Sequence, residues 1–221
     1  MKGQAYLGWP KKYLSSFLKG VNTIAFIPFA GVTFSYDEYT NSVQNALNEF
    51  DVEVIGIHTA IDKEALIKES DCVMVGGGNT FSLLSQLQNK NLVKPIQDAI
   101  SGGKKYVGWS AGSNMACPTI KTTNDMPIEE PQSFDALNLV GFQINPHFTN
   151  ETIPNHGGES RELRIKEFLV RNPEYVVVGL PEGMLIEVNN EETTLAGKGE
   201  AVLFKADQQP IYMKPGKVVL D

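Results

Sequence analysis

The sequence predicts an α/β fold, with a mostly parallel sheet flanked by helices and antiparallel β-hairpins at the C-terminal end. Short apolar runs alternate with segments of helical periodicity through the first half of the chain, as in repeated strand–helix units. Several of these runs are apolar at successive positions, which is typical of strands covered on both faces. After residue 184, short runs are separated by turn residues, which indicates hairpins.

Length and composition indicate one domain. The 221 residues, of which 42% are hydrophobic, are enough to bury one sizeable core. The sequence contains no internal repeat, low-complexity tract or linker. We therefore expect residues 1–221 to form a single catalytic domain.

The net charge, the lack of long apolar runs and the two cysteines each exclude some classes of partner, location or site. Asp and Glu outnumber Lys and Arg by 26 to 19, for a formal net charge of -7, which argues against nucleic acid and anionic membranes as partners. No apolar run has transmembrane length and no signal-peptide pattern opens the chain, so we expect a soluble, cytoplasmic protein. Cys72 and Cys117 lack metal-binding spacing and are interpreted as small core residues.

The first half contains four strand–helix units. Pro10 lies in the first turn of a helix over residues 10–18, where its missing N–H costs nothing. Ser35 and Glu38 form a capping box ahead of a helix that extends to about residue 50. Further helices are expected to begin after Asp62 and over residues 81–88 and 92–100. The expected strands are residues 23–29, 52–57, 72–75 and 106–109.

The second half is less regular. A short helix ends at Pro118, and residues 119–134 are expected to be an irregular polar loop. Strands are predicted over residues 141–145 and 175–180, with a charged helix over residues 159–171 between them.

Residues 108–112 match the G-x-S-x-G pattern of a nucleophile elbow. In such an elbow a serine stands on a sharp strand-to-helix turn, with small neighbours because the turn is crowded. Ser110 is therefore a candidate nucleophile, and the N–H of the next residue, Ala111, would point to the same place. A plain glycine turn remains the alternative from this pattern by itself.

Four predicted strands end in polar or glycine-rich residues: the glycine loop at 76–78, Ser110, His147 and Glu182. Ligands of open parallel sheets bind outside the carboxyl ends of the strands, so we expect these residues to form one site. The glycine loop lacks a Walker lysine and the G-x-G-x-x-G spacing. We therefore favour a role for this loop as a second N–H donor to an oxyanion, beside Ala111, over a role in binding phosphate.

A serine nucleophile needs a base and an acid that orients it. The chain has three histidines, and His58 and His147 both follow strands, whereas His156 lies in a glycine-containing loop. The strand that precedes His147 follows the elbow, which slightly favours His147. Asp125 and Glu182 both remain candidates for the acid.

Several motifs, in order, closely resemble the peptidase E family of α-aspartyl dipeptidases, and the resemblance covers roughly residues 23 to 205. The motifs are FIPFAGV (26–32), DEYT (37–40), GGGNTF (76–81), GWSAGSN (108–114), CPTI (117–120), TTNDMPI (122–128), INPHFTN (144–150) and GLPEG (179–183). The resemblance implies a fold like that of class I glutamine amidotransferases, with serine in place of their cysteine. It further implies hydrolysis of dipeptides with N-terminal aspartate (Asp-Xaa), with no metal or cofactor.

The resemblance also assigns roles to single residues. It implies that Ser110 is the nucleophile, His147 its base, and Asp125 the triad acid, with Glu182 proposed for the same role. Oxyanion N–H groups would come from Gly78 and Ala111. Arg161 falls where the family has an arginine for the aspartate side chain of the substrate.

One departure from the family pattern concerns the start of the chain. The resemblance implies an apolar strand before the first helix, and residues 1–8 do not provide one. We therefore expect the first family strand to be absent and a sheet edge to be exposed. A monomer or a small homo-oligomer is expected.

Two other functions remain open. A related serine hydrolase, such as a cyanophycinase-like peptidase or an esterase, could use the same residues, although an esterase of the α/β-hydrolase type would place its histidine after the last strands. A non-catalytic relative that binds ligands is disfavoured, because Ser110, His147 and both acids are present.

Overall fold

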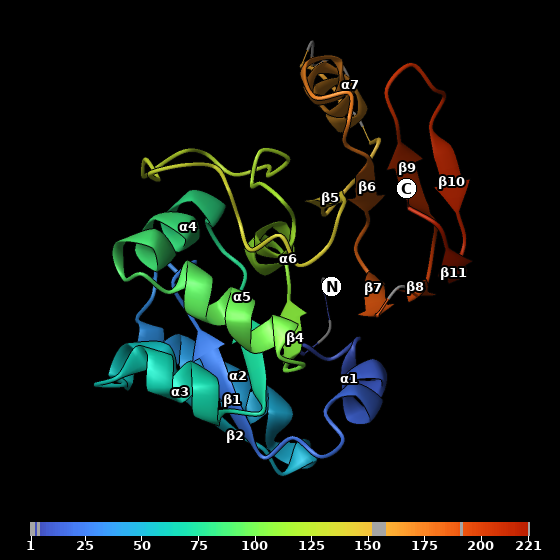
Figure 1. Ribbon diagram of the computed structural model, residues 1–221. Helices are drawn as coiled ribbons and strands as arrows, with labels where there is room; N and C mark the ends of the chain where they lie inside the picture. Colours follow the sequence, from blue (N-terminus) through green and yellow to red (C-terminus); the bar gives the residue numbers. More distant parts are fainter. Residues whose placement is uncertain (1–2, 4, 152–157, 191, 221) are drawn as a thin grey trace.

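The computed structural model describes residues 3, 5–151, 158–190 and 192–220 (Figure 1). Its first half contains a four-stranded parallel sheet in the order β2-β1-β3-β4, which confirms the predicted α/β class. The strands are β1 (Thr23–Ile27), β2 (Glu53–Gly56), β3 (Cys72–Val75) and β4 (Lys105–Gly108).

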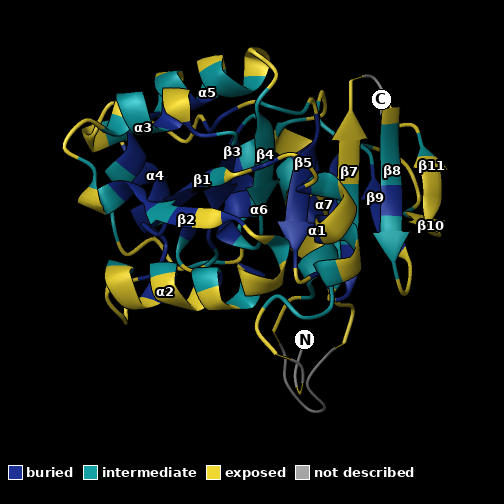
Figure 2. Cartoon of the chain, turned by 90° about the horizontal axis from the view of Figure 1, so that it is seen from below, coloured by how far each residue is buried: buried dark blue, intermediate teal, exposed yellow. Residues whose placement is uncertain are grey.

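The apolar runs form strands here because both faces of the sheet are covered. Side chains alternate along a strand, so Ile24 and Phe26 of β1 pack on one face while Ile27 packs on the other. Figure 2 shows the strands of this sheet between two layers of helices. The first face is covered by α1 (Lys11–Phe17) and α2 (Tyr36–Leu47). The other face is covered by α3 (Lys63–Glu69), α4 (Thr80–Asn89) and α5 (Val93–Ser101).

The second half forms a separate four-stranded sheet in the order β10-β9-β6-β5. Only β5 (Gln143–Pro146) and β6 (Val177–Leu180) are parallel; β9 (Ala201–Phe204) and β10 (Ile211–Met213) are antiparallel to their neighbours. Helix α7 (Arg161–Arg171) packs Ile165 and Leu169 on one face.

A small antiparallel sheet covers the other face of this second sheet. It consists of β7 (Met184–Asn189), β8 (Glu192–Gly197) and β11 (Gly216–Val218). Met184 and Leu195 pack there with Val178 and Leu203 of the second sheet. The antiparallel pairing of β7 with β8 confirms the hairpins that the turn residues predict.

Helix α6 (Ala111–Ala116) joins the two main sheets, since it packs against both β4 and β5. Asn114, which is buried, donates from Nδ2 to the Ile144 carbonyl of β5 at 2.8 Å. Helix α6 begins shortly after the end of β4, and it also contacts β5, the strand that precedes His147.

Several element boundaries differ from expectation by a few residues, and in two cases a 3-10 turn follows the element. The strand expected over residues 52–57 ends at Gly56, and a 3-10 turn over Ile57–Thr59 follows it. The capping box of Ser35 and Glu38 is present, but α2 ends at Leu47 and continues as a 3-10 turn over Asn48–Phe50.

Strand β4 forms one edge of the parallel sheet, and its residues are half-buried, whereas those of β3 are fully buried. Within the described ranges, no strand precedes β1. Of the helices in those ranges, none combines the length and the apolar composition needed to span a bilayer.

Candidate active site

Ser110 lies on a sharp turn between β4 and α6. Its backbone has φ 55° and ψ -113°, a combination that L-residues rarely adopt and that is typical of a nucleophile elbow. The side chain is half-buried, and the residue that follows it starts the helix. The strand and the helix together fix where the hydroxyl is presented, as the G-x-S-x-G pattern predicts.

Two backbone N–H groups beside this turn are available as donors. Gly78 has φ 136°, and a Cβ at this position would lie 2.1 Å from the Ala30 carbonyl oxygen, so only glycine fits. Ala111 is the first residue of α6, where an N–H has no partner within the helix. Among the described hydrogen bonds, none uses the N–H of Gly78 or of Ala111.

His147 follows β5 and contacts Glu182, which follows β6. These strands are parallel neighbours, so their carboxyl ends lie side by side, and Phe148 N–H donates to the Leu180 carbonyl at 3.1 Å just beyond them. The His147 Nδ1 forms a short hydrogen bond with Glu182 Oε1. The two side chains are 48% and 53% exposed, so the pair is open to solvent. With Nδ1 so engaged, Nε2 is left for a substrate-side proton transfer.

Asp125, the other candidate for the acid, makes its described hydrogen bonds with Thr80 and Thr123 and not with His147. Its Oδ2 accepts hydrogen bonds from Thr80 N at 2.8 Å, Thr80 Oγ1 at 2.6 Å and Thr123 Oγ1 at 3.1 Å. Thr80 is the first residue of α4, and a carboxylate is stabilised there by the unpaired N–H groups of the helix. The carboxylate that contacts His147 is Glu182, the alternative.

The loop that contains Asp125 connects the two halves of the site. Asn124 Nδ2 donates to the Pro146 carbonyl at the end of β5, at 2.8 Å. Two residues later, the Met126 carbonyl accepts from Asn79 Nδ2, also at 2.8 Å. Asn79 follows the glycine loop after β3, so this segment holds the carboxyl ends of β3 and β5 on the same side of the molecule.

Of the other two histidines, the structure describes only His58, whose described hydrogen bond goes to another residue. His58 lies in the 3-10 turn after β2, where its Nε2 is 2.8 Å from Asp37 Oδ1. His156 lies outside the described residues. No hydrogen bond within the described ranges joins Ser110 Oγ to His147, and in serine hydrolases without substrate this bond is often long and tightens on binding.

Arg161 is turned toward the end of β5. It is the first residue of α7, and its Nη1 donates to the Pro146 carbonyl at 3.2 Å and, over a shorter distance, to the His147 carbonyl. Partial burial, and then the charge of Arg164, lower the pKa of Arg161 from its ordinary value. The described hydrogen bonds and ion pairs leave its Nε and Nη2 unused. A cation with free donors therefore lies beside His147.

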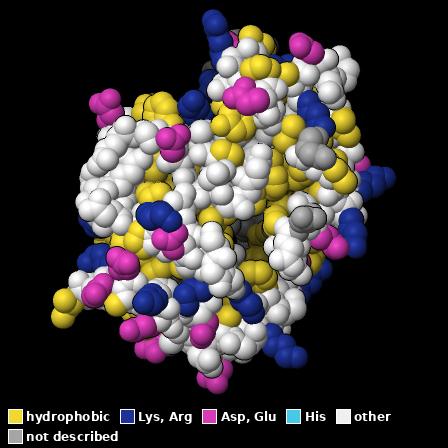
Figure 3. Space-filling view, viewed as in Figure 1, with side chains coloured by type: hydrophobic (Ala, Val, Ile, Leu, Met, Phe, Trp, Pro, Cys, Tyr) yellow, Lys and Arg dark blue, Asp and Glu magenta, His cyan; other side chains and the backbone are white. Residues whose placement is uncertain are grey.

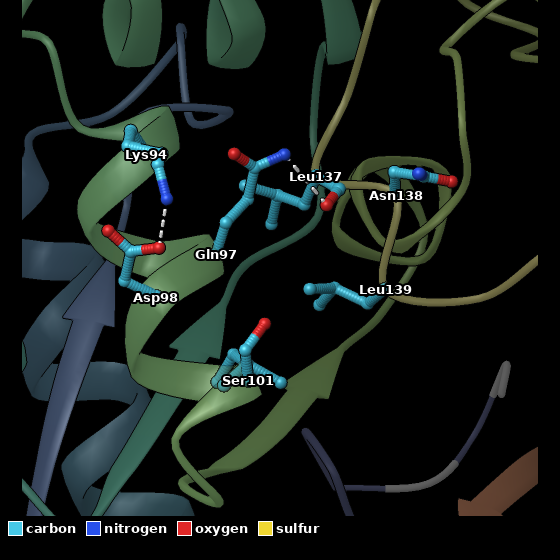
Figure 4. Close-up of a pocket in the computed structure, with 8 residues that line it drawn as sticks. Lys94, Gln97, Asp98, Ser101, Leu137, Asn138 and Leu139 are labelled. Carbon is cyan, nitrogen blue, oxygen red and sulfur yellow. Dashed lines mark hydrogen bonds and ion pairs between the residues drawn. The ribbon is translucent and has the colours of Figure 1, made fainter.

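The surface of the molecule has two hollows whose lining residues can be named. One, of about 480 Å³, adjoins the site; it is lined by residues that include Phe148, Glu182, Lys198 and Tyr212. The other lies away from it, between α5 and residues 137–139, where Gln97 Nε2 donates to the Leu137 carbonyl at 3.1 Å (Figure 4). Figure 3 shows a hollow near the centre of the face that it presents.

Some contacts at the site were not indicated by sequence reasoning. Tyr39 lies in α2 with its side chain buried, and its hydroxyl donates to the Gly77 carbonyl at 2.9 Å. The only signal for it was its place in the DEYT motif (37–40). As for metals, no group of three or more His, Cys, Asp or Glu side chains in the described part of the chain is arranged to hold one.

Comparisons with known proteins place this geometry in a family. The model of peptidase family S51 matches residues 1–196. Peptidase E of Shigella flexneri serotype 5b (strain 8401) is 47% identical over 216 residues, which are 98% of this chain and 94% of that protein, and peptidase E of Escherichia coli O6:K15:H31 matches equally. A crystal structure of a proposed peptidase E protein from Listeria monocytogenes EGD-e is 25% identical with a TM-score of 0.58, and covers 92% of this chain and 96% of that one. A peptidase from an acI-B1 Actinobacterium shares the fold, with a TM-score of 0.66, 15% identity and coverage of 95% and 93%. The chain belongs to peptidase family S51.

Proposed function

We propose that this peptidase is a serine dipeptidase that hydrolyses dipeptides with an N-terminal aspartate. In this proposal Ser110 is the nucleophile, His147 the base and Glu182 the acid that orients it. The observation that carries the proposal is the pair of His147 and Glu182 at the ends of β5 and β6, on a scaffold in which Ser110 directly precedes α6. The order Ser, His, Glu along the chain also differs from the Ser, acid, His order of esterases of the α/β-hydrolase type.

The chemistry follows from the atoms that these residues offer. His147 Nε2 takes the proton of the Ser110 hydroxyl as its oxygen attacks the carbonyl carbon of the dipeptide, and the N–H groups of Gly78 and Ala111 receive the oxyanion. Glu182 accepts the Nδ1–H and stabilises the imidazolium. His147 then gives its proton to the leaving amine, and water releases the acyl group from Ser110 by the reverse transfers. Substrate is a small peptide; we expect no cofactor, metal, nucleic acid or membrane partner.

Arg161 supports the choice of aspartate. A negatively charged substrate needs a local cation on a protein with net charge -7. The Arg161 guanidinium is held beside His147 by two backbone carbonyls, and its remaining N–H groups can bind a carboxylate in the two-point geometry that lysine cannot reproduce. We expect a side chain of aspartate length to suit this site, because a longer one would push the scissile carbonyl away from Ser110.

The test is a dipeptide panel of Asp-Leu, Asn-Leu, Glu-Leu and Leu-Leu on wild type, Arg161→Lys and Arg161→Ala. We expect wild type to prefer Asp-Leu over Asn-Leu by about a hundredfold or more in kcat/KM, because an arginine left facing an amide is unpaired. Both variants should lose most of this preference, although Arg161→Lys keeps the charge.

Arg164→Ala serves as the matched control, since Arg164 lies on the same helix but is exposed and 3.9 Å from Glu159. It should keep the preference for Asp-Leu. Equal cleavage of Asp-Leu and Asn-Leu by wild type would contradict the aspartyl specificity, and cleavage of p-nitrophenyl esters without cleavage of dipeptides would indicate an esterase.

A further inference from the structure

Tyr39 connects the core of the protein to the glycine loop. Its ring, only 6% exposed, packs edge-on against Phe26 and Phe34, each with ring centroids 5.0 Å apart. Its hydroxyl donates to the Gly77 carbonyl at 2.9 Å and accepts from the Tyr6 hydroxyl at 3.3 Å. Burial raises the pKa of Tyr39, so the phenol remains protonated and acts as a donor at neutral pH.

The carbonyl that Tyr39 binds belongs to the same peptide group as the Gly78 N–H. The described peptide bonds are trans, so the C=O of Gly77 and the N–H of Gly78 point in opposite directions. Tyr39 therefore fixes the rotation of this peptide plane and turns the Gly78 N–H away from the core. Glycines on both sides would otherwise let the plane rotate easily.

The same loop lies against the nucleophile. A Cβ at Gly77 would come within 2.9 Å of Ser110 Cβ, and a Cβ at Gly76 would come within 2.5 Å of the Tyr39 hydroxyl. The loop is thus packed between Tyr39 and Ser110, with no side chain of its own in either contact. Its other side is held by the hydrogen bond from Asn79 N–H to the Ala30 carbonyl at 2.8 Å.

We propose that Tyr39 is a positioning residue for the oxyanion hole: its hydroxyl holds the Gly77–Gly78 peptide so that the Gly78 N–H faces the reacting carbonyl at Ser110. This inference rests on the proposed serine-peptidase function. Tyr39 touches neither substrate nor the reacting atoms, and acts only through the orientation of one peptide group.

The test compares Tyr39→Phe with Tyr36→Phe. Both remove one hydroxyl from α2 and keep the ring, but no described hydrogen bond uses the Tyr36 hydroxyl, and its ring packs on Phe29 and His58 instead. Loss of a whole oxyanion donor costs about 10²–10³ in kcat, so a misaligned donor should cost about tenfold. We expect Tyr39→Phe to lower kcat by this factor with KM little changed, and Tyr36→Phe to lower neither.

Two readouts separate positioning from a general loss of structure. The affinity of a peptide aldehyde, whose adduct with Ser110 carries an oxyanion, should fall in Tyr39→Phe by the same factor as kcat. The NMR signal of the Gly78 amide, followed by ¹⁵N-glycine labelling, should shift in Tyr39→Phe and stay in place in Tyr36→Phe. The NMR readout requires no activity.

The possible results distinguish the role of Tyr39 from the proposed peptidase function. Full kcat in Tyr39→Phe, or a lowered kcat with an unshifted Gly78 signal, overturns the inference while leaving the peptidase function intact. Absence of dipeptide hydrolysis in wild type overturns the proposed function and the inference together. If Tyr39→Phe fails to fold, Tyr6→Phe removes the donor to the Tyr39 hydroxyl, and it should show a smaller change of the same kind in both kcat and the Gly78 signal; no change in either overturns the inference.

Discussion

Ser110 and His147 both have a positive backbone φ, with values of 55° and 54°. A positive φ is costly for residues with a side chain, and it persists where the surrounding structure determines it. Around Ser110 the determinants are β4 and α6, and around His147 they are the parallel ends of β5 and β6. Both residues therefore directly follow a strand of the sheets or lie within two residues of its end.

The first prediction concerns the acid. Glu182→Gln should lower kcat by about 10³–10⁴, because an amide no longer stabilises the imidazolium and favours the wrong tautomer of His147. Asp125→Asn should keep most of kcat and lower the unfolding temperature, since its carboxylate holds Thr80 and Thr123. Steady-state kinetics and thermal unfolding of both variants check this. The opposite pattern of kinetic losses would return the role to Asp125.

For single residues, the sequence predicts the turn at Ser110 but does not distinguish Asp125 from Glu182 as the acid that orients His147. The elbow is a local pattern, in which strand, glycine and helix are all read from neighbouring residues. The partner of Asp125 is Thr80, 45 residues earlier, and the loop between residues 119 and 134 has no periodicity from which such a contact could be predicted. The sequence left Asp125 and Glu182 both open as the acid, and in the structure only Glu182 has a described contact with His147.

Among the elements, capped helices and buried strands could be predicted, and the division of the sheets could not. Ser35 and Asp62 cap the helices that their side chains predict. Strand pairing depends instead on contacts between distant segments. Nothing in the apolar runs indicates that β4 and β5 belong to different sheets, or that α6 packs against both.

The second prediction concerns Asp71, which ties the start of β3 to the start of β1. Its Oδ2 accepts from Asn22 N at 2.8 Å and Thr23 N at 3.1 Å, and these backbone hydrogen bonds lower the pKa of Asp71 from its ordinary value. A carboxyl whose folded pKa is depressed stabilises the fold above its unfolded pKa of about 3.9, and this contribution is lost as pH falls through the folded value.

Thermal unfolding of wild type and Asp71→Asn should therefore differ at pH 7 and converge as the pH falls through the lowered folded pKa of Asp71. Glu53→Gln is the control, because its exposed side chain makes no described hydrogen bond, and it should match wild type at both pH values. A difference between wild type and Asp71→Asn that is independent of pH would contradict this assignment.

On the scale of the whole molecule, the site is built from two sheets. The parallel sheet supplies Ser110 and the glycine loop, and the second sheet supplies His147 and Glu182. Asn114 of α6 and Asn124 of the following loop each donate to backbone carbonyls of β5, so they hold the halves in register. Catalysis by such a site requires that a nucleophile from one half and a base from the other act as a unit.

The kinetics of Ser110→Ala, His147→Ala and the double variant on Asp-Leu test this claim most directly. If the two residues act as a unit, each single variant should lose several orders of magnitude in kcat, and the double variant should lose little more. All three should unfold at temperatures close to that of wild type. Full activity of Ser110→Ala, or losses that multiply in the double variant, would contradict the account.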